Sequence, residues 1–274
     1  MPVSELPSHR VRDLVVLDGE DGHVLVQEYL DHAVAAMKAS TGLILNTFDA
    51  LERPELARIR RELDIPVFDI GPLHMFSPAA ESSLLPEDRS CLEWLDARPP
   101  ASVLYVSFGS LACMSPQELV ETAWGIAGSG VLFLWVIRPG LVSGDRCAHH
   151  QMPEGFEAAT RGRGTVVAWA PQEEVLRHRA VGGFWTHNGW NATVESVAEG
   201  VPMLSRPCFG DQMRNASWAA SSAEAAVRRL MTETDGDEMR ARAGELKKAA
   251  VECTGKAGSS CLAIDKLVTH IMSL

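Results

Sequence analysis

The sequence predicts an α/β fold in which helices cover both faces of a doubly wound, parallel sheet. Short apolar runs alternate with stretches of helical period along most of the 274 residues, a pattern typical of βα units. The apolar run 181–185 leads directly into a polar turn and then a helix, as strands do in such a sheet. Hydrophobic residues make up 46% of the chain, which supports an ordinary globular core.

The first part of the chain contains two predicted strands and two predicted helices. We expect residues 1–20 to be loop or extended chain, and residues 24–38 to form a helix because apolar side chains recur there at helical spacing. The run GLILNT at 42–47 predicts a buried strand. A helix at 54–63 and a strand at 67–70 follow, and this alternation predicts parallel pairing.

A polar, Ser- and Pro-rich stretch at 74–90 predicts an inter-domain linker, and a short helix at 91–96 follows it. The apolar run 103–108 then predicts the first strand of a second domain. The tetrapeptide SPQE at 115–118 is a capping box with proline at the first helical position. It starts a helix that we expect to end near Gly128.

The remaining elements follow the same alternation. A buried strand at 131–137 ends beside Arg138, and the strand at 164–169 leads into the stretch that carries most of the polar chemistry. The other expected elements are a loop at 140–163, a strand at 181–185, a helix at 192–199 stopped by Gly200 and Pro202, an acidic loop at 233–238, and C-terminal helices within 239–250 and 259–271.

The turn after the strand at 181–185 suits an anion. The first turn of a helix presents N–H groups without intrahelical partners and the positive end of the helix dipole. No Lys or Arg lies between Val181 and Met203. A pyrophosphate at this turn would therefore rest on backbone N–H groups, His187 and Asn191.

Residues on either side of the turn complete a nucleotide-sugar site. Trp169 can stack a flat base, and Glu195, one turn into the helix, can accept two hydrogen bonds from a ribose diol. Asp211 and Gln212 offer an acceptor and an amide to a second polyol.

The 44 positions from Trp169 to Gln212 resemble the donor-binding signature of plant family 1 UDP-glycosyltransferases, enzymes of the GT-B fold, through WAPQ, AVGGF, GWN, GVPM and DQ. The run SFGS at 107–110 and the runs GLILNTFDALE and IGPL resemble the same family. The resemblance implies stacking of uracil on Trp169, ribose on Glu195, and the phosphates on His187, Asn191 and the turn backbone. The donor-binding residues that it implies are Ser110, Trp169, Ala170, Gln172, His187, Gly189, Trp190, Asn191, Ala192, Glu195, Asp211 and Gln212, the last two for the sugar.

The sequence departs from the family pattern in three places. Ala192 replaces a serine, which removes one hydroxyl from the implied phosphate site, a loss of about 0.5–1.5 kcal/mol. Asn188 replaces a cysteine, and we expect little effect. After Asn215 the resemblance breaks off and resumes near Ala225, as if an internal piece were missing.

The resemblance also implies a domain plan. It gives a partial N-terminal, acceptor-side domain at 1–73, a linker at 74–100, a UDP-sugar donor-binding domain at 101–250 and a C-terminal helix at 251–274. The chain thus resembles a family member that lacks most of the N-terminal domain.

The function implied by the resemblance is that of a UDP-dependent hexosyltransferase of plant secondary metabolism. It would transfer glucose from UDP-glucose to a small phenolic or other hydroxylated acceptor, with inversion and without a metal or cofactor. The family's catalytic base is a histidine early in the N-terminal domain, and no residue here matches it, so no catalytic residue is assigned. The alternatives are a catalytically inactive UDP-sugar-binding fragment and a non-functional gene product.

Three other histidines are weaker candidates for a catalytic base or a metal site. His23 follows Asp21-Gly22, but the surroundings do not match a catalytic loop, so a solvated side chain is favoured. His149 and His150 lie in a polar stretch without the further ligands or the H-E-x-x-H frame that a metal site needs.

The bulk composition excludes several classes. A net charge of −11 argues against nucleic acid or an anionic membrane as partner. Six cysteines show no C-x-x-C pairing, which favours thiols in a reducing cytoplasm. No apolar run reaches the ~18–20 residues of a membrane span, and the first residues lack the apolar core of a signal peptide. We expect a cytoplasmic monomer, and the absence of G-x-G-x-x-G after a strand disfavours a dehydrogenase.

Overall fold

The computed structural model describes residues 2–3, 6–10, 22–77, 83–143, 152–208, 212 and 223–274. Asp211, His149, His150 and the break after Asn215 lie outside the described residues, as does the side chain of His23. The expectations for them therefore stay predictions.

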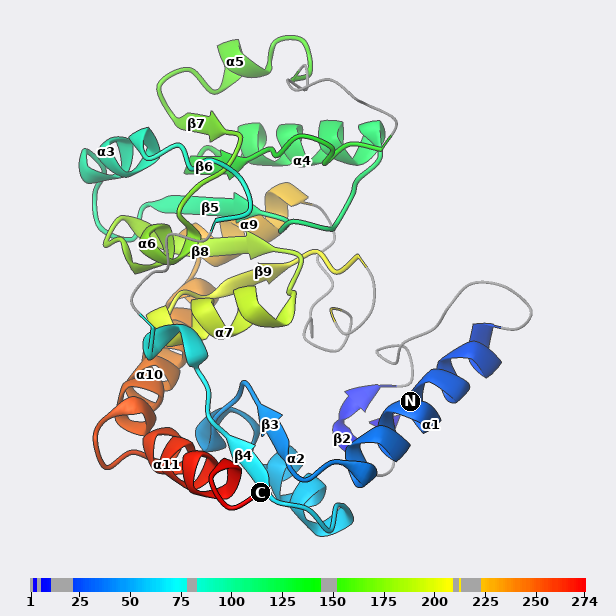
Figure 1. The fold of residues 1–274 in the computed structure, drawn as a ribbon. Coiled ribbons are helices and arrows are strands. Elements are labelled where there is room, and N and C mark those ends of the chain that lie inside the picture. The colour runs from blue at the N-terminus through cyan, green and yellow to red at the C-terminus, as the bar shows by residue number, and fades with distance from the viewer. Residues whose placement is uncertain are drawn as a thin grey trace. The chain divides into compact units, whose positions relative to one another are not determined.

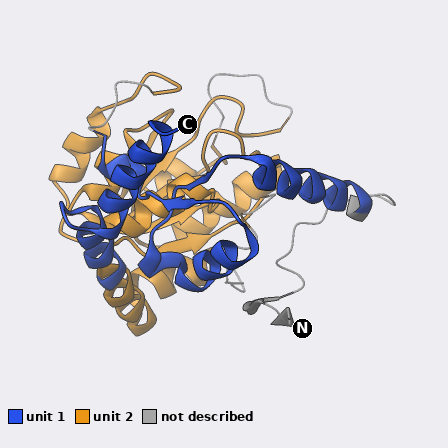
Figure 2. Ribbon diagram, turned by 60° about the horizontal axis from the view of Figure 1, so that its bottom comes forward, with its two compact units in different colours: residues 1–80, 245–274 blue, residues 81–244 orange. Residues whose placement is uncertain are grey.

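The chain divides into two compact units (Figure 2). The first combines residues 1–80 with 245–274, and the second is the continuous stretch 81–244. The first boundary falls inside the linker expected at 74–100, and the second precedes the C-terminal segment expected at 251–274. Most of the expected linker packs with the second unit instead of standing apart, because Cys91 and Leu95 are buried in its core.

The second unit is built on a parallel sheet with the strand order β7-β6-β5-β8-β9 (Figure 1). The strands are β5 (Val103–Ser107), β6 (Leu132–Val136), β7 (Gly164–Val167), β8 (Val181–Thr186) and β9 (Met203–Ser205). All the pairings are parallel, which confirms the predicted sheet. Their carboxyl ends consequently share one edge.

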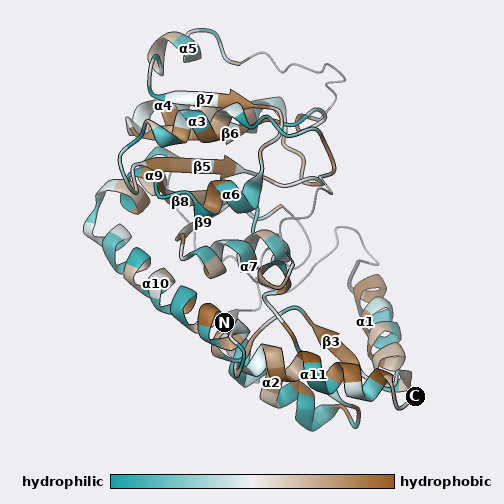
Figure 3. Cartoon of the chain, turned by 60° about the vertical axis from the view of Figure 1, so that its left-hand side comes forward, coloured by the Kyte–Doolittle hydropathy of each residue, from teal (hydrophilic) through white to brown (hydrophobic). Residues whose placement is uncertain are grey.

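Helices cover both faces of this sheet, so the predicted double winding is confirmed. Along β5, Leu104 and Val106 face one core, while Val103 and Tyr105 face the other, the alternation that a pleated strand imposes. The helices of the first face are α4 (Pro116–Ser129) and α9 (Ala223–Thr232), and those of the second are α3 (Ser90–Asp96), α6 (Gln172–Arg177) and α7 (Trp190–Glu199). Figure 3 shows β5, at the middle of the sheet, in the brown of hydrophobic residues.

The capping box of α4 forms as its sequence predicts. Ser115 Oγ accepts a hydrogen bond from the Glu118 N–H over 3.2 Å, and Glu118 Oε2 accepts one from the Ser115 N–H over 2.7 Å. The helix continues to Ser129 and stops at Gly130, whose φ of +76° suits glycine. The expected end near Gly128 was slightly too early.

Two expected loops contain helix. The helix α5 (Phe156–Ala159) interrupts the expected loop at 140–163, because Phe156 is buried against Phe133 and Trp135. The helix α10 (Thr234–Thr254) begins inside the expected acidic loop at 233–238. Acidic side chains in its first turn favour a helix N-terminus, so that charge run starts a helix.

The first unit contains a parallel pair of strands, β3 (Leu43–Leu45) and β4 (Val67–Asp69). Phe68 and Ile70 pack with Ala263 of the C-terminal helix, and Ser260 Oγ donates a hydrogen bond to the Gly71 carbonyl over 2.6 Å. Ile44 is 51% exposed, so β3 is less buried than its sequence suggests.

The other elements of this unit are β1 (Pro2–Val3) paired with β2 (Leu6–Arg10), α1 (Gly22–Ala39), α2 (Asp49–Glu62), the short 3₁₀ turn η2 (Leu73–Met75) and α11 (Ser259–Ile271). The predicted helix at 54–63 is the second part of α2, which has a kink at Glu52. Of the helices in the described part of the chain, none combines the length and the apolar character needed to cross a membrane.

Candidate functional site

The segments that follow four of the five strands carry the predicted site residues. Ser110 follows β5, Trp169 follows β7, His187 follows β8 and Gln212 follows β9. Because all five strands are parallel, these segments leave the sheet at its carboxyl edge, where open α/β sheets bind ligands.

The imidazole of His187 lies between two glycines. A Cβ atom on Gly109 would come within 2.4 Å of His187 Cε1, and one on Gly189 within 2.5 Å of Nε2. Gly109 also has a φ of +72°, which L-residues with side chains rarely adopt. His187 Nδ1 is 3.4 Å from Thr186 Oγ1. The imidazole thus fits at the entrance of α7 because neither Gly109 nor Gly189 has a side chain.

The start of α7 has the features of an anion site. Gly189 occupies the N-cap position without a side-chain cap, and no acidic residue lies in the first turn. Asn191 is exposed there. The first N–H groups of an α-helix lack intrahelical acceptors and carry partial positive charge, so this turn can receive a phosphate.

The two substituted positions of the turn are both buried. Asn188 is 1% exposed, has a φ of +58° and directs Nδ2 to Met203 Sδ at 3.8 Å. Asparagine tolerates this left-handed conformation better than most residues, so position 188 is more constrained than the sequence suggests. Ala192 is 7% exposed and packs in the core.

Glu195 is held by a chain of side chains from two other elements. Gln172 Nε2, on α6, donates a hydrogen bond to Glu195 Oε2 over 2.7 Å. The buried Tyr105 hydroxyl donates to Gln172 Oε1 over 3.3 Å. The sequence identified Gln172 and Glu195 but not Tyr105, whose hydroxyl inside an otherwise apolar strand was the available signal.

Burial raises the pKa of Glu195 to about 7, against the opposing hydrogen bond from Gln172 and with a further rise from the Glu173 carboxylate. Desolvation disfavours the charged form of a carboxylic acid. A ligand that donates hydrogen bonds to this carboxylate would favour its ionisation. The arrangement therefore suits a vicinal diol.

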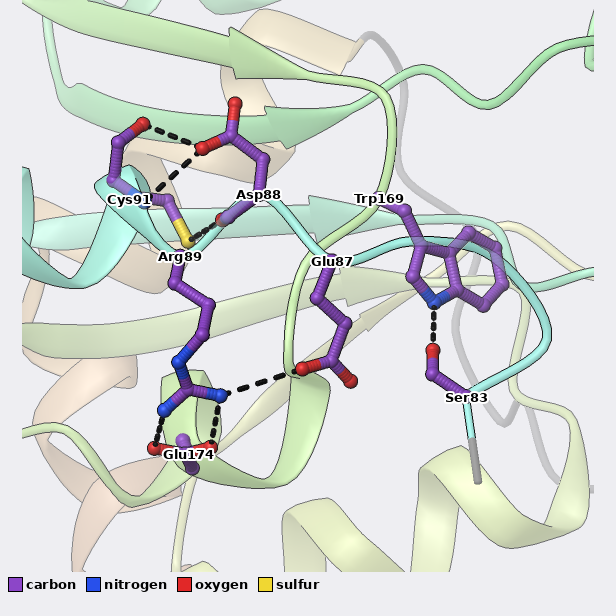
Figure 4. Close-up of polar contacts among 8 residues, drawn as sticks. Ser83, Glu87, Asp88, Arg89, Cys91, Trp169 and Glu174 are labelled. Atoms are coloured by element: carbon purple, nitrogen blue, oxygen red, sulfur yellow. Dashed lines mark hydrogen bonds and ion pairs between the residues drawn. The ribbon is translucent and has the colours of Figure 1, made fainter. Parts of the chain in front are cut away.

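Trp169 is attached to the segment that precedes α3 (Figure 4). Its indole Nε1 donates a hydrogen bond to Ser83 Oγ over 2.8 Å, and its carbonyl accepts one from the Asp88 N–H over 2.9 Å. Arg89 forms two hydrogen bonds with the Glu174 carboxylate, of 2.8 and 2.7 Å. The segment 83–89 thus fixes both ends of Trp169, a contact that no local sequence pattern signals.

Arg138 is 8% exposed, and it binds carbonyls of the segments that follow β5 and β6. Its Nε donates to Gly109 O over 2.9 Å, and its terminal nitrogens donate to Pro139 O over 3.1 Å and to Ala112 O over 2.6 Å. In the sequence Arg138 is only the residue after a strand. A cation directly after a buried run was the signal that could have identified it.

The described residues after β9 are linked to one another and to α4. Gln212 is 3% exposed, and its Oε1 accepts a hydrogen bond from the Cys208 N–H over 2.8 Å. Arg206 pairs with Glu118 over 2.5 Å and lies 5.3 Å from the Phe108 ring. The charge of Arg206 is therefore already matched by a carboxylate beside the site.

Two further features bear on catalysis. His178 and Asp96 approach to 3.2 Å, but His178 precedes β8 and so lies at the amino edge of the sheet, away from the site. Within the described ranges, no cluster of His, Cys, Asp and Glu side chains has the composition of a metal site.

A comparison with protein families identifies the chain. The model described as UDP-glucoronosyl and UDP-glucosyl transferase matches residues 70–240, more than half of the chain. The chain belongs to this transferase family. The family membership suggested by the stretch 169–212 is therefore confirmed.

Relatives of this chain include plant proteins named as UDP-glycosyltransferases. The chain is 45% identical over 273 residues to the maize protein named DIMBOA UDP-glucosyltransferase BX9, across 93% of this chain and 58% of that protein. It is 40% identical over 287 residues to UDP-glycosyltransferase 76B1 of Arabidopsis thaliana, across 99% of this chain and 64% of that protein. The chain thus spans somewhat over half the length of these relatives.

A solved structure shows the same fold. The chain superposes on a UDP-glucose: anthocyanidin 3-O-glucosyltransferase in complex with UDP with a TM-score of 0.84 at 30% identity, over 98% of this chain and 62% of that one. The GT-B type of fold expected from the resemblance is confirmed.

Proposed function

We propose that the second unit binds the UDP part of a UDP-sugar at the carboxyl edge of its sheet. The observation that carries the proposal is the order of groups along this edge. Trp169 lies at one end, the Gln172–Glu195 pair, joined over 2.7 Å, comes next, and His187 stands at the entrance of α7. A base stacker, a diol acceptor and an anion site in this order match a nucleoside diphosphate.

The full activity that we propose is transfer of glucose from UDP-glucose to a small phenolic or other hydroxylated acceptor, with inversion. It rests on the relatives' names, and the chain spans 58% of the first of them. We assign the sugar contacts to Asp211 and Gln212. Neither metal nor cofactor is part of the proposal, and we propose that the chain acts as a monomer.

The second candidate is UDP-sugar binding without transfer. It is favoured by the position of His178 and Asp96, a described histidine–carboxylate pair that lies at the opposite edge from the donor site. Transfer needs a positioned base beside the acceptor hydroxyl, worth about 10²–10⁴-fold in rate. A chain that binds UDP-sugar but has no such base would be a binding protein.

We propose a cytoplasmic location from the thiols. Cys91, Cys113, Cys208, Cys253 and Cys261, the cysteines within the described residues, are free. Unpaired thiols are usual in a reducing compartment.

The deciding experiment is calorimetric titration of the purified 274-residue chain with UDP and with UDP-glucose. We expect saturable binding of both, and no binding of UDP would refute the donor-site proposal. Incubation with UDP-glucose and a panel of phenols, followed by mass spectrometry, separates the two candidates. Glucosides above a heat-inactivated control support the transferase, and binding without glucosides supports the binding protein.

A further inference from the structure

The loop from Gly109 to Ala112 lies between β5 and α4 and is tied down at both ends. At its far end, Met114 pairs with the neighbouring segment, since its N–H donates to Leu141 O over 2.9 Å and its carbonyl accepts from the Ser143 N–H over 2.8 Å. At its near end, Phe108 packs edge-on against Trp185 at 5.9 Å. Between these ties, the backbone of the loop is held by Arg138.

Arg138 binds this loop with a geometry that only a guanidinium provides. Its Nε reaches the carbonyl of Gly109 over 2.9 Å and one terminal nitrogen reaches that of Ala112 over 2.6 Å. The planar fork of arginine can serve both carbonyls at once, whereas a lysine ammonium is a single point of charge. The side chain is buried, so losing these acceptors would leave a cation in a poorly hydrated place.

The residue that Arg138 holds is in turn the residue that confines His187. Gly109 has no room for a Cβ, which would lie 2.4 Å from the imidazole. A shift of the Gly109 backbone would therefore release the ring or push it. Ser110, the next residue, moves with the same peptide.

We propose that Arg138 is a positioning residue for the diphosphate end of the donor site, a role that rests on the proposed function. It acts through the carbonyls of Gly109 and Ala112, which place Ser110 and confine His187 beside the first turn of α7. The proposal gives Arg138 no contact with the base or the ribose, which are assigned to Trp169 and Glu195.

The test compares the binding of UDP and of uridine, which lacks the phosphates. In wild type we expect UDP to bind more tightly than uridine. In Arg138→Lys, which keeps the charge but loses the fork, UDP affinity should fall about 10- to 100-fold, the range of one lost charge-assisted hydrogen bond to the phosphates. Uridine affinity should stay within about twofold, a change that a single hydrogen bond would exceed.

The matched control is Arg163→Lys. Arg163 also binds three backbone carbonyls, those of Val131, Ala127 and Ala159, over 3.3, 3.0 and 2.8 Å. It precedes β7 and so lies at the amino edge of the sheet. This variant loses the same kind of interaction but should keep the preference for UDP over uridine.

A second pair of variants tests the same device if Arg138→Lys does not fold. Gly109→Ala places a methyl group against His187 at a φ of +72°, while Gly130→Ala has nearly the same φ, +76°, with no atom within 4 Å of the new methyl. Both place alanine at a similar positive φ. Only Gly109→Ala should lose the preference for UDP.

The outcomes separate the two proposals. If wild type binds neither ligand, the donor site and this inference both fail. If wild type prefers UDP and both Arg138→Lys and Gly109→Ala keep that preference, the donor site stands and the positioning role is wrong. Equal weakening of UDP and uridine would also overturn it, because it would show a general structural role.

Discussion

The indole nitrogen of Trp169 donates a hydrogen bond of 2.8 Å to the hydroxyl of Ser83, 86 positions earlier in the chain. The same tryptophan is the one that we propose to stack the base. Ser83, in the segment that precedes α3, therefore helps to fix the plane of the Trp169 ring.

Replacing Ser83 should weaken the binding of UDP. The Ser83→Ala variant loses one neutral hydrogen bond to the stacking residue, so we expect a loss of about 0.5–1.5 kcal/mol by calorimetry. Ser83→Thr keeps the hydroxyl and should restore the affinity. In ¹H–¹⁵N spectra, the indole signal of Trp169, assigned with Trp169→Phe, should move in Ser83→Ala alone.

The control for this change is Ser102→Ala, since Ser102 donates a hydrogen bond of 2.7 Å to Pro99 O in the turn before β5. It should leave the Trp169 signal and the UDP affinity unchanged. An unmoved Trp169 signal in Ser83→Ala would show that the hydrogen bond does not form in solution.

Removing the Glu195 carboxylate should weaken UDP by about 1.5–3 kcal/mol, because hydrogen bonds to a charged acceptor are the strong ones. Uridine should lose as much, since the ribose is common to both ligands. Titration of Glu195→Ala against Glu199→Ala, a carboxylate at the far end of the same helix paired with Arg177, isolates the effect. Equal UDP affinity in wild type and Glu195→Ala would sink the ribose role.

UDP affinity should depend on pH through Glu195, whose pKa burial raises to about 7. The ionised carboxylate accepts from a diol better than the protonated acid does, so wild-type affinity should fall from pH 8 to pH 6. Glu195→Gln carries no such titration, and because it sees the same ionisation of the UDP phosphates, it corrects for the ligand. Parallel pH profiles for the two proteins would contradict the assignment.

The raised pKa of Glu195 makes folding stability change with pH in the opposite direction to UDP affinity. An unfolded glutamate ionises near 4.5, whereas folded Glu195 holds its proton up to about 7. Between these values the unfolded state binds fewer protons, so the free energy of unfolding contributed by this group falls as pH rises. Urea unfolding at pH 4.5, 6 and 8 should show a smaller fall in Glu195→Gln than in wild type.

Asp211 should discriminate the sugar and not the nucleotide. We expect Asp211→Ala to leave UDP affinity nearly unchanged and to reduce the advantage of UDP-glucose over UDP. Asp265→Ala, on α11 of the first unit, serves as the charge-matched control for calorimetry. If both ligands weaken to the same degree in Asp211→Ala, the residue has a structural role.

Two glycine variants should change stability in opposite directions. A Cβ on Gly182, in β8, would lie 2.2 Å from the Ala101 carbonyl oxygen, whereas one on Gly244, in α10, meets nothing within 4 Å. Overpacking against backbone should cost about 1–3 kcal/mol in Gly182→Ala. Gly244→Ala should gain about 0.5–1 kcal/mol, because alanine loses less backbone freedom in a helix. Urea unfolding measures both, and destabilisation by Gly244→Ala would contradict the open space.

Local signals predicted the elements of the second unit well. The box at 115–118 has its cap, proline and glutamate within four residues, and the helix begins there. The helix α6 was missed because its six residues, 172–177, are too few to show a helical period. Its position depends on the burial of Val175 and Leu176 in the core shared with distant strands.

The site could be predicted only where one short stretch carries it. Trp169, His187 and Glu195 all lie in the stretch 169–212, so their residue types and spacing indicate their chemistry. Arg138 and Ser83 are connected to the proposed site through hydrogen bonds to Gly109 and Trp169. The pairing of Ser83 with Trp169 follows from the fold and has no trace in the local sequence, whereas for Arg138 the only local signal is a cation directly after a buried run.

The discontinuous make-up of the first unit has a consequence for biosynthesis. Its strands β3 and β4 leave the ribosome before residues 81–244, whereas α11, which packs on Phe68 and Ile70, is made after them. Residues 81–244 form their own compact unit in one uninterrupted run and can fold while the rest is still being synthesised. A premature stop between residues 245 and 258 would therefore spare the unit that we propose binds UDP and leave β3 and β4 without α11.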